Sequence, residues 1–413
     1  MKFPEGFLWG TATAAHQVEG GNINSDYWMI EHLPVTPFVD RSGDACDQYH
    51  RYREDFAMLS GMGFNTYRFS IEWARVEPEP GEFSNAAVEH YRRVLAACHE
   101  ARMAPMATLH HFSSPRWVAA RGGFENRETA KLFARYCERI ARELGDLIAY
   151  ACTINELNSV PHLQHSAVMP GDDAILQLPW RVEAARRYGI GPEGFSMFPF
   201  AALSSTAPVV IEAHRMAVQA LASGRGRFPI GMTVAMQEIE AEPGGEEHAA
   251  RAARESENIF LEAARGDGFV GVQTYTRRRF GQSGPLPPPA GARLTQMGYE
   301  YRPEALEATI RRAASIARTP VIVTENGIAT DDEAERRDFI RKALDCVGRC
   351  IADGIDVRGY YYWSAMDNFE WALGYAPKFG IVAVDRATQR RMVKASGEWL
   401  GRVARANSTE IEA

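Results

Sequence analysis

The sequence lacks the excess of basic charge that proteins need to bind nucleic acids or anionic membranes. Its 413 residues contain 46 lysines and arginines against 53 aspartates and glutamates, which gives a formal net charge of −7. Such a chain has no surplus of cations with which to displace counterions from a phosphate backbone or an anionic lipid surface. We therefore expect neither a nucleic-acid partner nor a membrane partner.

Long apolar runs are also missing. No apolar stretch approaches the roughly 20 residues that a membrane-spanning helix needs. Residues 1–6 contain no basic segment leading into an apolar run, which a secretory signal would require. We expect a cytoplasmic protein, whose oligomeric state (monomer or homodimer) the sequence leaves open.

Cysteines are few and scattered. The chain has six, placed in strand-like and helix-like segments, which indicates buried reduced thiols rather than a disulfide framework. Cys346 and Cys350 lie one helical turn apart, but no histidine accompanies them at the spacing of a metal site. We expect both to pack in the core, and we expect no metal site.

Strand-like segments alternate with helix-like segments along the whole chain. The predicted strands are residues 7–10, 64–70, 104–111, 151–156, 229–234, 269–275, 321–323 and 357–363. The predicted helices are residues 47–59, 86–101, 132–144, 209–222, 255–264 and a segment after a Thr330–Glu333 capping box. Eightfold alternation without a break in composition predicts one α/β domain over residues 1–413, a (β/α)₈ TIM barrel.

Two other features bear on this fold prediction. A doubly wound sheet is the alternative, but it needs a glycine-rich phosphate turn after its first strand, and the sequence has none there. The proline-rich residues 281–291 are interpreted as a stiff loop at the barrel rim.

Two glutamates follow predicted strands. Glu325 comes after three β-branched residues and before the turn signal Asn326-Gly327, while Glu156 ends the fourth strand. The C-terminal ends of all barrel strands meet at one rim, where such folds place their active sites. Paired carboxylates there suggest an enzyme that cleaves glycosidic bonds, although two structural acids capping neighbouring helices remain the alternative.

Other side chains suited to a sugar follow the predicted strands. They are Gln17, Arg68, His111, Asn155, Tyr275, Trp363, Glu370 and Trp371. Sugar hydroxyls both donate and accept hydrogen bonds, and the C–H faces of a pyranose stack on indoles. Singly, His111 could be a structural histidine and Arg68 an internal ion-pair partner, but a common position at one rim favours a sugar site.

The chain resembles glycoside hydrolase family 1, the β-glucosidase-like retaining enzymes, over nearly its whole length. The motifs that carry the resemblance are residues 7–10, 17–20, 67–73, 108–111, 153–156, 323–327, 363–371 and 378–380. Several long motifs in the family's order make a chance match implausible.

The resemblance implies roles for individual residues. Glu325 would be the nucleophile and Glu156 the acid/base, with carboxyl groups roughly 5–5.5 Å apart. Arg68 and Tyr275 would keep Glu325 ionised, and its charge would hold the proton on Glu156.

The same resemblance implies how the sugar is held. Asn155 would bind the 2-hydroxyl, and Trp363 would form a stacking floor. The other residues expected to bind substrate are Gln17, His111, Glu370, Trp371 and Phe379.

The implied activity is hydrolysis of terminal β-D-glucosyl O-glycosides, with some tolerance of galactosides or fucosides, without a cofactor. A transglycosylase would use the same two glutamates and remains an alternative. A catalytically silent sugar-binding barrel is disfavoured, because silent members typically lose one glutamate and this chain has both. Glu370-Trp371 stand where phosphosugar-specific relatives carry serine and lysine, which predicts an unphosphorylated sugar.

The chain departs from the family pattern at three places. Leu157 replaces a proline, Ser113-Ser114 replace Asp-Leu, and Gln273-Thr274 replace asparagine and an aromatic residue. We interpret these changes as clustered on the leaving-group side, with an aglycone preference unlike that of a cellobiose-cleaving enzyme. His162 and His165 could line the same entrance or lie on the surface, and we do not count them as site residues.

Overall fold

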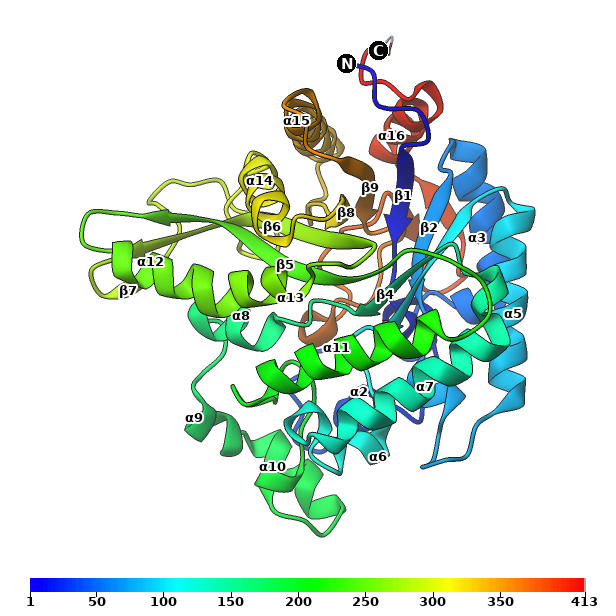
Figure 1. The fold of residues 1–413 in the computed structure, drawn as a ribbon, viewed down its shortest axis with the longest axis vertical. Coiled ribbons are helices and arrows are strands. Elements are labelled where there is room, and N and C mark those ends of the chain that lie inside the picture. The colour runs from blue at the N-terminus through cyan, green and yellow to red at the C-terminus, as the bar shows by residue number, and fades with distance from the viewer. Residues whose placement is uncertain (412–413) are drawn as a thin grey trace.

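The computed structural model describes residues 1–411 of the chain, which form a closed barrel of parallel strands surrounded by helices (Figure 1). The barrel strands are β1 (Leu8–Ala12), β2 (Thr66–Ser70), β3 (Ala104–His110), β4 (Tyr150–Ile154), β5 (Ile230–Ala241), β6 (Phe269–Gly281), β8 (Val321–Asn326) and β9 (Val357–Trp363). Each pairs in parallel with the next, and the β9–β1 and β5–β6 pairings close the ring. The predicted (β/α)₈ TIM barrel is confirmed.

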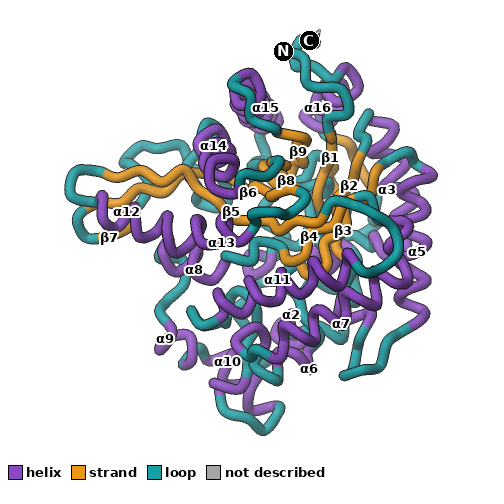
Figure 2. Tube along the Cα trace, viewed as in Figure 1, coloured by secondary structure: helices purple, strands orange, loops and turns teal. Residues whose placement is uncertain are grey.

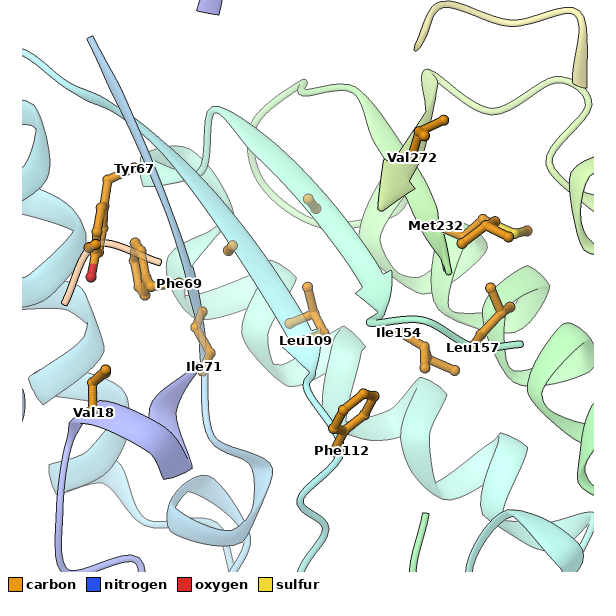
Figure 3. Close-up of a cluster of buried hydrophobic side chains, with 14 of the residues drawn as sticks. Val18, Tyr67, Phe69, Ile71, Leu109, Phe112, Ile154, Leu157, Met232 and Val272 are labelled. Atoms are coloured by element: carbon orange, nitrogen blue, oxygen red, sulfur yellow. The ribbon is translucent and has the colours of Figure 1, made fainter. Parts of the chain in front are cut away.

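Burial on both faces explains the composition of the strands. Every residue of β1, β2 and β8 is buried, because one face of each strand points into the barrel and the other packs against helices. A small cluster fills the barrel interior, including Met106, Ile322 and Tyr361. A much larger cluster lies between strands and helices, and Figure 3 shows part of it around Tyr67 and Phe69 of β2.

The main helices surround the barrel, as the purple segments in Figure 2 show. They are α3 (Gln48–Met62), α5 (Asn85–Glu100), α7 (Glu128–Leu144), α11 (Thr206–Ala222), α14 (Ala305–Ala317), α15 (Glu333–Ala352) and α16 (Ala395–Ala406). Shorter helices are α1 (Ala15–Val18), α2 (Asp26–Glu31), α4 (Trp73–Val76), α6 (Arg116–Ala119), α8 (Ser159–His165), α9 (Asp172–Leu176), α10 (Pro179–Arg187), α12 (Glu246–Ala253) and α13 (Ile259–Ala263). The predicted helix over 255–264 is divided, because a π-helical turn precedes α13.

The predicted capping box at the start of α15 is wrong. The N-cap is Asp332, whose carboxylate accepts hydrogen bonds from the backbone N–H groups of Ala334 and Glu335. The Thr330 hydroxyl instead accepts from the Asp332 N–H and binds the Glu335 carboxylate. An aspartate one residue before the helix is the better placed acceptor for its first free N–H groups.

Strands β5 and β6 continue beyond the barrel as a two-stranded arm, seen at the left of Figure 1. Their pairing runs from Gly231–Phe269 to Ala241–Phe280, with an irregularity after Met236. Strand β7 (Gly284–Leu286) then pairs antiparallel with β6, so the interpretation of 281–291 as a simple rim loop is wrong for this part. A second hairpin joins β10 (Val382–Val384) and β11 (Arg391–Val393).

All six cysteines are buried with free thiols. Cys346 and Cys350 belong to the main core cluster, as predicted. Across residues 1–411 none of the helices is both long enough and apolar enough to cross a membrane.

Candidate active site

A cavity of about 400 Å³ opens among the C-terminal ends of the barrel strands. Nine of the eleven predicted site residues line it: His111, Asn155, Glu156, Tyr275, Glu325, Trp363, Glu370, Trp371 and Phe379. The other two, Gln17 and Arg68, are buried and hydrogen-bonded to residues that line the cavity. The predicted site residues thus lie in or beside one cavity at the strand ends, and its volume suits a small polar ligand.

Glu325 is held at the end of β8 by two donors. Arg68 Nη1 donates to Oε1 at 2.5 Å, and the Tyr275 hydroxyl donates to Oε2 at 2.7 Å. Burial raises the pKa of Glu325, while Arg68 and Tyr275 act in the opposite direction. The next turn requires glycine, because a Cβ on Gly327 would lie 2.0 Å from the Trp363 carbonyl oxygen.

Asn155 is oriented through its amide oxygen. This oxygen accepts from Arg68 Nη2 at 2.6 Å, from Gln273 Nε2 at 2.9 Å and from the Thr233 hydroxyl at 3.3 Å. With the oxygen so occupied, the amide NH₂ is the group that Asn155 can offer to a ligand, an assignment that follows from the hydrogen-bond network.

Glu156 follows β4 in a left-handed backbone conformation with φ +43°. Residues other than glycine seldom adopt this region, and they do so where the surrounding structure enforces it. Here the Glu156 N–H donates to the Thr233 hydroxyl at 2.9 Å, and the Ser159 hydroxyl donates to the Glu156 carboxylate at 3.2 Å.

The Glu156 carboxyl is half-buried and its pKa is raised to about 8. Burial is the larger cause, and the negative charge of Glu325 is the second. At neutral pH Glu156 therefore carries a proton, as a general acid must.

Gln17 and Glu370 lie together beyond the ends of β1 and β9, and Glu370 lines the cavity. Gln17 Nε2 donates to the Phe369 carbonyl at 2.8 Å and lies 3.4 Å from a Glu370 carboxylate oxygen. Gln17 Oε1 is buried and has no hydrogen-bond partner within residues 1–411. The pKa of Glu370 is raised to about 8 by burial and by Glu325, so this carboxyl can both donate and accept at neutral pH.

Three aromatic rings form the adjoining wall. The His111 ring lies 5.7 Å from that of Trp363 and 6.2 Å from that of Trp371, each inclined by 25°. Burial and the nearby Arg68 hold the pKa of His111 well below its usual range, so its imidazole is neutral. A flat aromatic wall beside polar donors suits a ring that has both C–H faces and hydroxyl edges.

Most departures from the family pattern do not line the cavity, so the interpretation that they cluster on the leaving-group side is wrong. Ser113 and Ser114 are buried under the rim, where the Ser113 hydroxyl donates to Glu72 at 2.6 Å and the Ser114 N–H donates to Asp26 at 2.9 Å. Leu157 packs in the main core cluster, as Figure 3 shows. The Thr274 hydroxyl is buried and hydrogen-bonded to that of Thr309.

Gln273 is the exception, since it lines the cavity and holds Asn155. Together with Thr233 and Ser159 it was not among the predicted site residues. Gln273 pairs with Glu325 between β6 and β8. Its place in the site could therefore be recognised only once the strand register was known.

The two histidines whose location the sequence left open lie in different places. His162 of α8 lines the cavity, whereas His165 is paired with Glu255 at 3.0 Å and is not part of the lining. Near His162 the wall also includes Gln237, Arg278 and Tyr299, none of which was predicted. Among residues 1–411 no group of three or more histidine, cysteine, aspartate or glutamate side chains could hold a metal ion.

Comparisons with known proteins agree with this arrangement. The family model described as glycosyl hydrolase family 1 matches residues 1–284 and 289–409. The chain is 30% identical to β-glucosidase A of Thermotoga maritima, over 99% of both chains. It is 31% identical to a bifunctional β-D-glucosidase/β-D-fucosidase of Bifidobacterium breve, over 97% of this chain and 98% of the relative.

Solved structures give the same result. The crystal structure of the β-glycosidase BGL167 superposes with a TM-score of 0.95 at 50% identity, and the match covers 100% of this chain and 99% of the other. The apo structure of β-glucosidase 1317 matches with a TM-score of 0.92 at 44% identity, covering 98% and 99% of the two chains. The protein is therefore a glycoside hydrolase that belongs to glycosyl hydrolase family 1.

Proposed function

We propose that the protein is a retaining β-glycosidase that hydrolyses terminal β-D-glucosyl O-glycosides through a covalent glycosyl-enzyme. One observation carries the proposal: a carboxylate held by a guanidinium and a phenol shares a cavity with a second carboxyl that keeps its proton at neutral pH. The first group suits a nucleophile and the second a general acid. We expect the two carboxyl groups to act about 5–5.5 Å apart, the separation of retaining enzymes.

In the first step Glu325 attacks the anomeric carbon while Glu156 protonates the departing oxygen. The C–O bond to the leaving group breaks as the bond to Glu325 forms. Glu325 is then a neutral ester, so its charge, the second cause of the raised pKa of Glu156, has gone and that pKa falls. Glu156 can therefore act as a base in the second step, deprotonating the water that releases the sugar.

Four neighbours would hold the sugar. The Asn155 amide NH₂ would donate to the 2-hydroxyl, a contact that strengthens as charge develops on the ring. The unpartnered oxygen of Gln17 and the neutral Glu370 carboxyl can accept from and donate to hydroxyls at the far end of the ring. Trp363 would support its C–H face, as in many sugar sites.

An unphosphorylated sugar fits this cavity. Phosphate groups are held by clustered arginines and lysines, but the single arginine or lysine that lines the cavity within residues 1–411 is Arg278, on the part of β6 that continues into the arm. Tolerance of β-fucosides, the activity that the name of the Bifidobacterium breve relative states, belongs to the same proposal. A 6-phosphoglucoside turned over faster than the plain glucoside would contradict it.

A fluorosugar trap tests the central claim. A 2-deoxy-2-fluoro-β-glucoside with a good leaving group should inactivate the enzyme quickly and label Glu325, because the fluorine slows release of the glycosyl-enzyme more than its formation. Rapid inactivation with the label on a different residue would overturn the role assignment. Product analysis in the presence of an alcohol measures the share of transfer, which relies on the same two glutamates.

A further inference from the structure

Three arginines follow one another on β6, and the middle one differs from its neighbours. Arg277 pairs with Glu300 at 2.7 Å and with Glu240 at 2.8 Å, and Arg279 pairs with Glu242. Successive side chains of a strand point to opposite faces. Arg278 therefore leaves the arm on the other side, where it lines the cavity.

Arg278 forms no ion pair with any carboxylate of the described residues 1–411. Its one hydrogen bond runs from Nε to the Gln237 side-chain oxygen at 3.5 Å, the outer limit of such a contact. Partial burial lowers the pKa of Arg278, and the Tyr299 phenol, not a carboxylate, acts in the opposite direction. A half-buried guanidinium without an anion is costly for a protein to retain, which indicates that a ligand supplies the missing charge.

The surroundings place Arg278 on the leaving-group side. The Gln237 side-chain oxygen accepts from Arg278 Nε at 3.5 Å and from the hydroxyl of Ser166, the residue after α8, at 3.4 Å, so the guanidinium lies near α8, the helix that follows Glu156. Tyr299 lies within electrostatic reach of Glu156 as well as of Arg278. Because Glu156 would protonate the departing oxygen, atoms that extend from it past Tyr299 toward Arg278 belong to the leaving group.

The cavity lining also has apolar side chains, beside polar ones such as Gln237 and Thr276. The apolar ones include Leu163, Val168, Phe200, Met297 and Leu373. Val168 and Leu373 are 60% and 43% exposed, so apolar surface continues to the rim. Contact with such a surface stabilises the binding of a hydroxyl-rich sugar little, whereas it stabilises the binding of an aromatic ring.

We propose that the leaving-group subsite takes an aglycone that combines an aromatic body with a carboxylate, and that Arg278 binds the carboxylate. This inference rests on the proposed glycosidase activity and makes its leaving group specific. Guanidinium–carboxylate contacts are strong when partly desolvated and can be bidentate. The subsite would then select glucosides of phenolic acids over those of neutral phenols.

Two substrates of one shape test the proposal: the β-glucosides of 4-hydroxybenzoate and of its methyl ester. The measured quantity is the ratio of kcat/KM for the acid to that for the ester. Intrinsic leaving-group reactivity cancels when this ratio is compared between enzymes. We expect the ratio to fall about tenfold in Arg278→Met, equivalent to about 1.4 kcal/mol, and less in Arg278→Lys.

Arg279→Met is the matched control. It removes the same charge one residue along the strand, but from the face that pairs with Glu242, and should keep the wild-type ratio. Higher ionic strength should lower the wild-type ratio and leave that of Arg278→Met unchanged. The same ratio in the wild type and in Arg278→Met would overturn the proposal, with turnover of the ester showing that the variant is folded.

A second pair of substrates tests whether the carboxylate must be attached to an aromatic ring or can belong to a sugar acid. A glucosyl disaccharide whose reducing unit is a uronic acid, compared with cellobiose, presents the same charge on a polar body. Dependence on Arg278 for this pair but not for the aromatic pair would overturn the aromatic part of the proposal. Failure to cleave any β-glucoside, activated aryl glucosides included, would instead overturn the proposed function itself.

Discussion

Arg68 and Glu325 form a buried ion pair across the barrel, with 2.5 Å between Nη1 and Oε1. Their strands, β2 and β8, are not neighbours in the sheet, so this contact spans the interior rather than following the ladder. Arg68 is fully buried and uses its second terminal nitrogen for Asn155. One guanidinium thus positions both the proposed nucleophile and the residue proposed to bind the 2-hydroxyl.

Removing this guanidinium should cost activity mainly through the charge of Glu325. In Arg68→Met the group that lowers the pKa of Glu325 most is lost, so that pKa should rise and the acidic limb of kcat/KM should move to higher pH. We expect kcat/KM to fall at least about 100-fold, typical of losing a charge-stabilising donor. Arg68→Lys is the control: it keeps a positive charge, so its acidic limb should lie closer to that of the wild type. An acidic limb at the wild-type pH in both variants would contradict the assignment.

The pH dependence should show a basic limb near pH 8. The pKa of Glu156 is raised to about 8, and its protonated form is the donor, so activity is present below that pH and lost above it. On the acidic side, activity should fall as Glu325 takes up a proton. Because burial raises the pKa of Glu325, this fall should occur at a pH above the usual range for a glutamate. The check is kcat/KM against pH for a glucoside with a poor leaving group.

Glu370 must be separated from Glu156 in that profile, since its pKa is also raised to about 8. In Glu156→Gln, assayed with an activated aryl glucoside, any basic limb that persists belongs to Glu370. A wild-type profile that stays flat from pH 6 to 10 would show that neither carboxyl controls the first step.

The barrel could be predicted from sequence because its signals are local. Strands such as β2 and β8 are short runs rich in β-branched or aromatic residues, a composition that burial on both faces favours. The arm was missed because its strands are polar there. Glu238 and Arg277 become partners across the two strands only when segments far apart in the chain pair.

The site could be predicted as far as side chains follow directly from strand ends. Thr233 and Gln273 were missed because each acts by a hydrogen bond to another side chain, which no spacing in the sequence reveals. Ser113 follows His111 closely in sequence but does not line the cavity with it. The backbone turns at Phe112, with φ +66°, and sends Ser113 to Glu72 instead.

Removing the acid/base should separate the two steps. In Glu156→Ala, glucosides with poor leaving groups should lose nearly all turnover, because nothing protonates the departing oxygen. Activated aryl glucosides should still form the glycosyl-enzyme, and azide should restore their turnover, since an anionic nucleophile needs no base. A β-glucosyl azide product is the direct evidence, and unchanged activity on all substrates would remove Glu156 from the mechanism.

Gln273 should matter through Asn155 and hence through the 2-hydroxyl of the sugar. Gln273→Ala removes one of three donors to the Asn155 oxygen, which frees the amide to rotate and weakens the contact proposed to strengthen in the transition state. We expect kcat/KM for a glucoside to fall about tenfold, the order of one neutral hydrogen bond. For the matching 2-deoxyglucoside, which has no 2-hydroxyl to hold, the same substitution should change kcat/KM by less than about twofold.

Thr274→Ser, one residue away with its hydroxyl directed to Thr309, serves as the control. Equal losses on both substrates would show that Gln273 supports the barrel rather than the sugar contact.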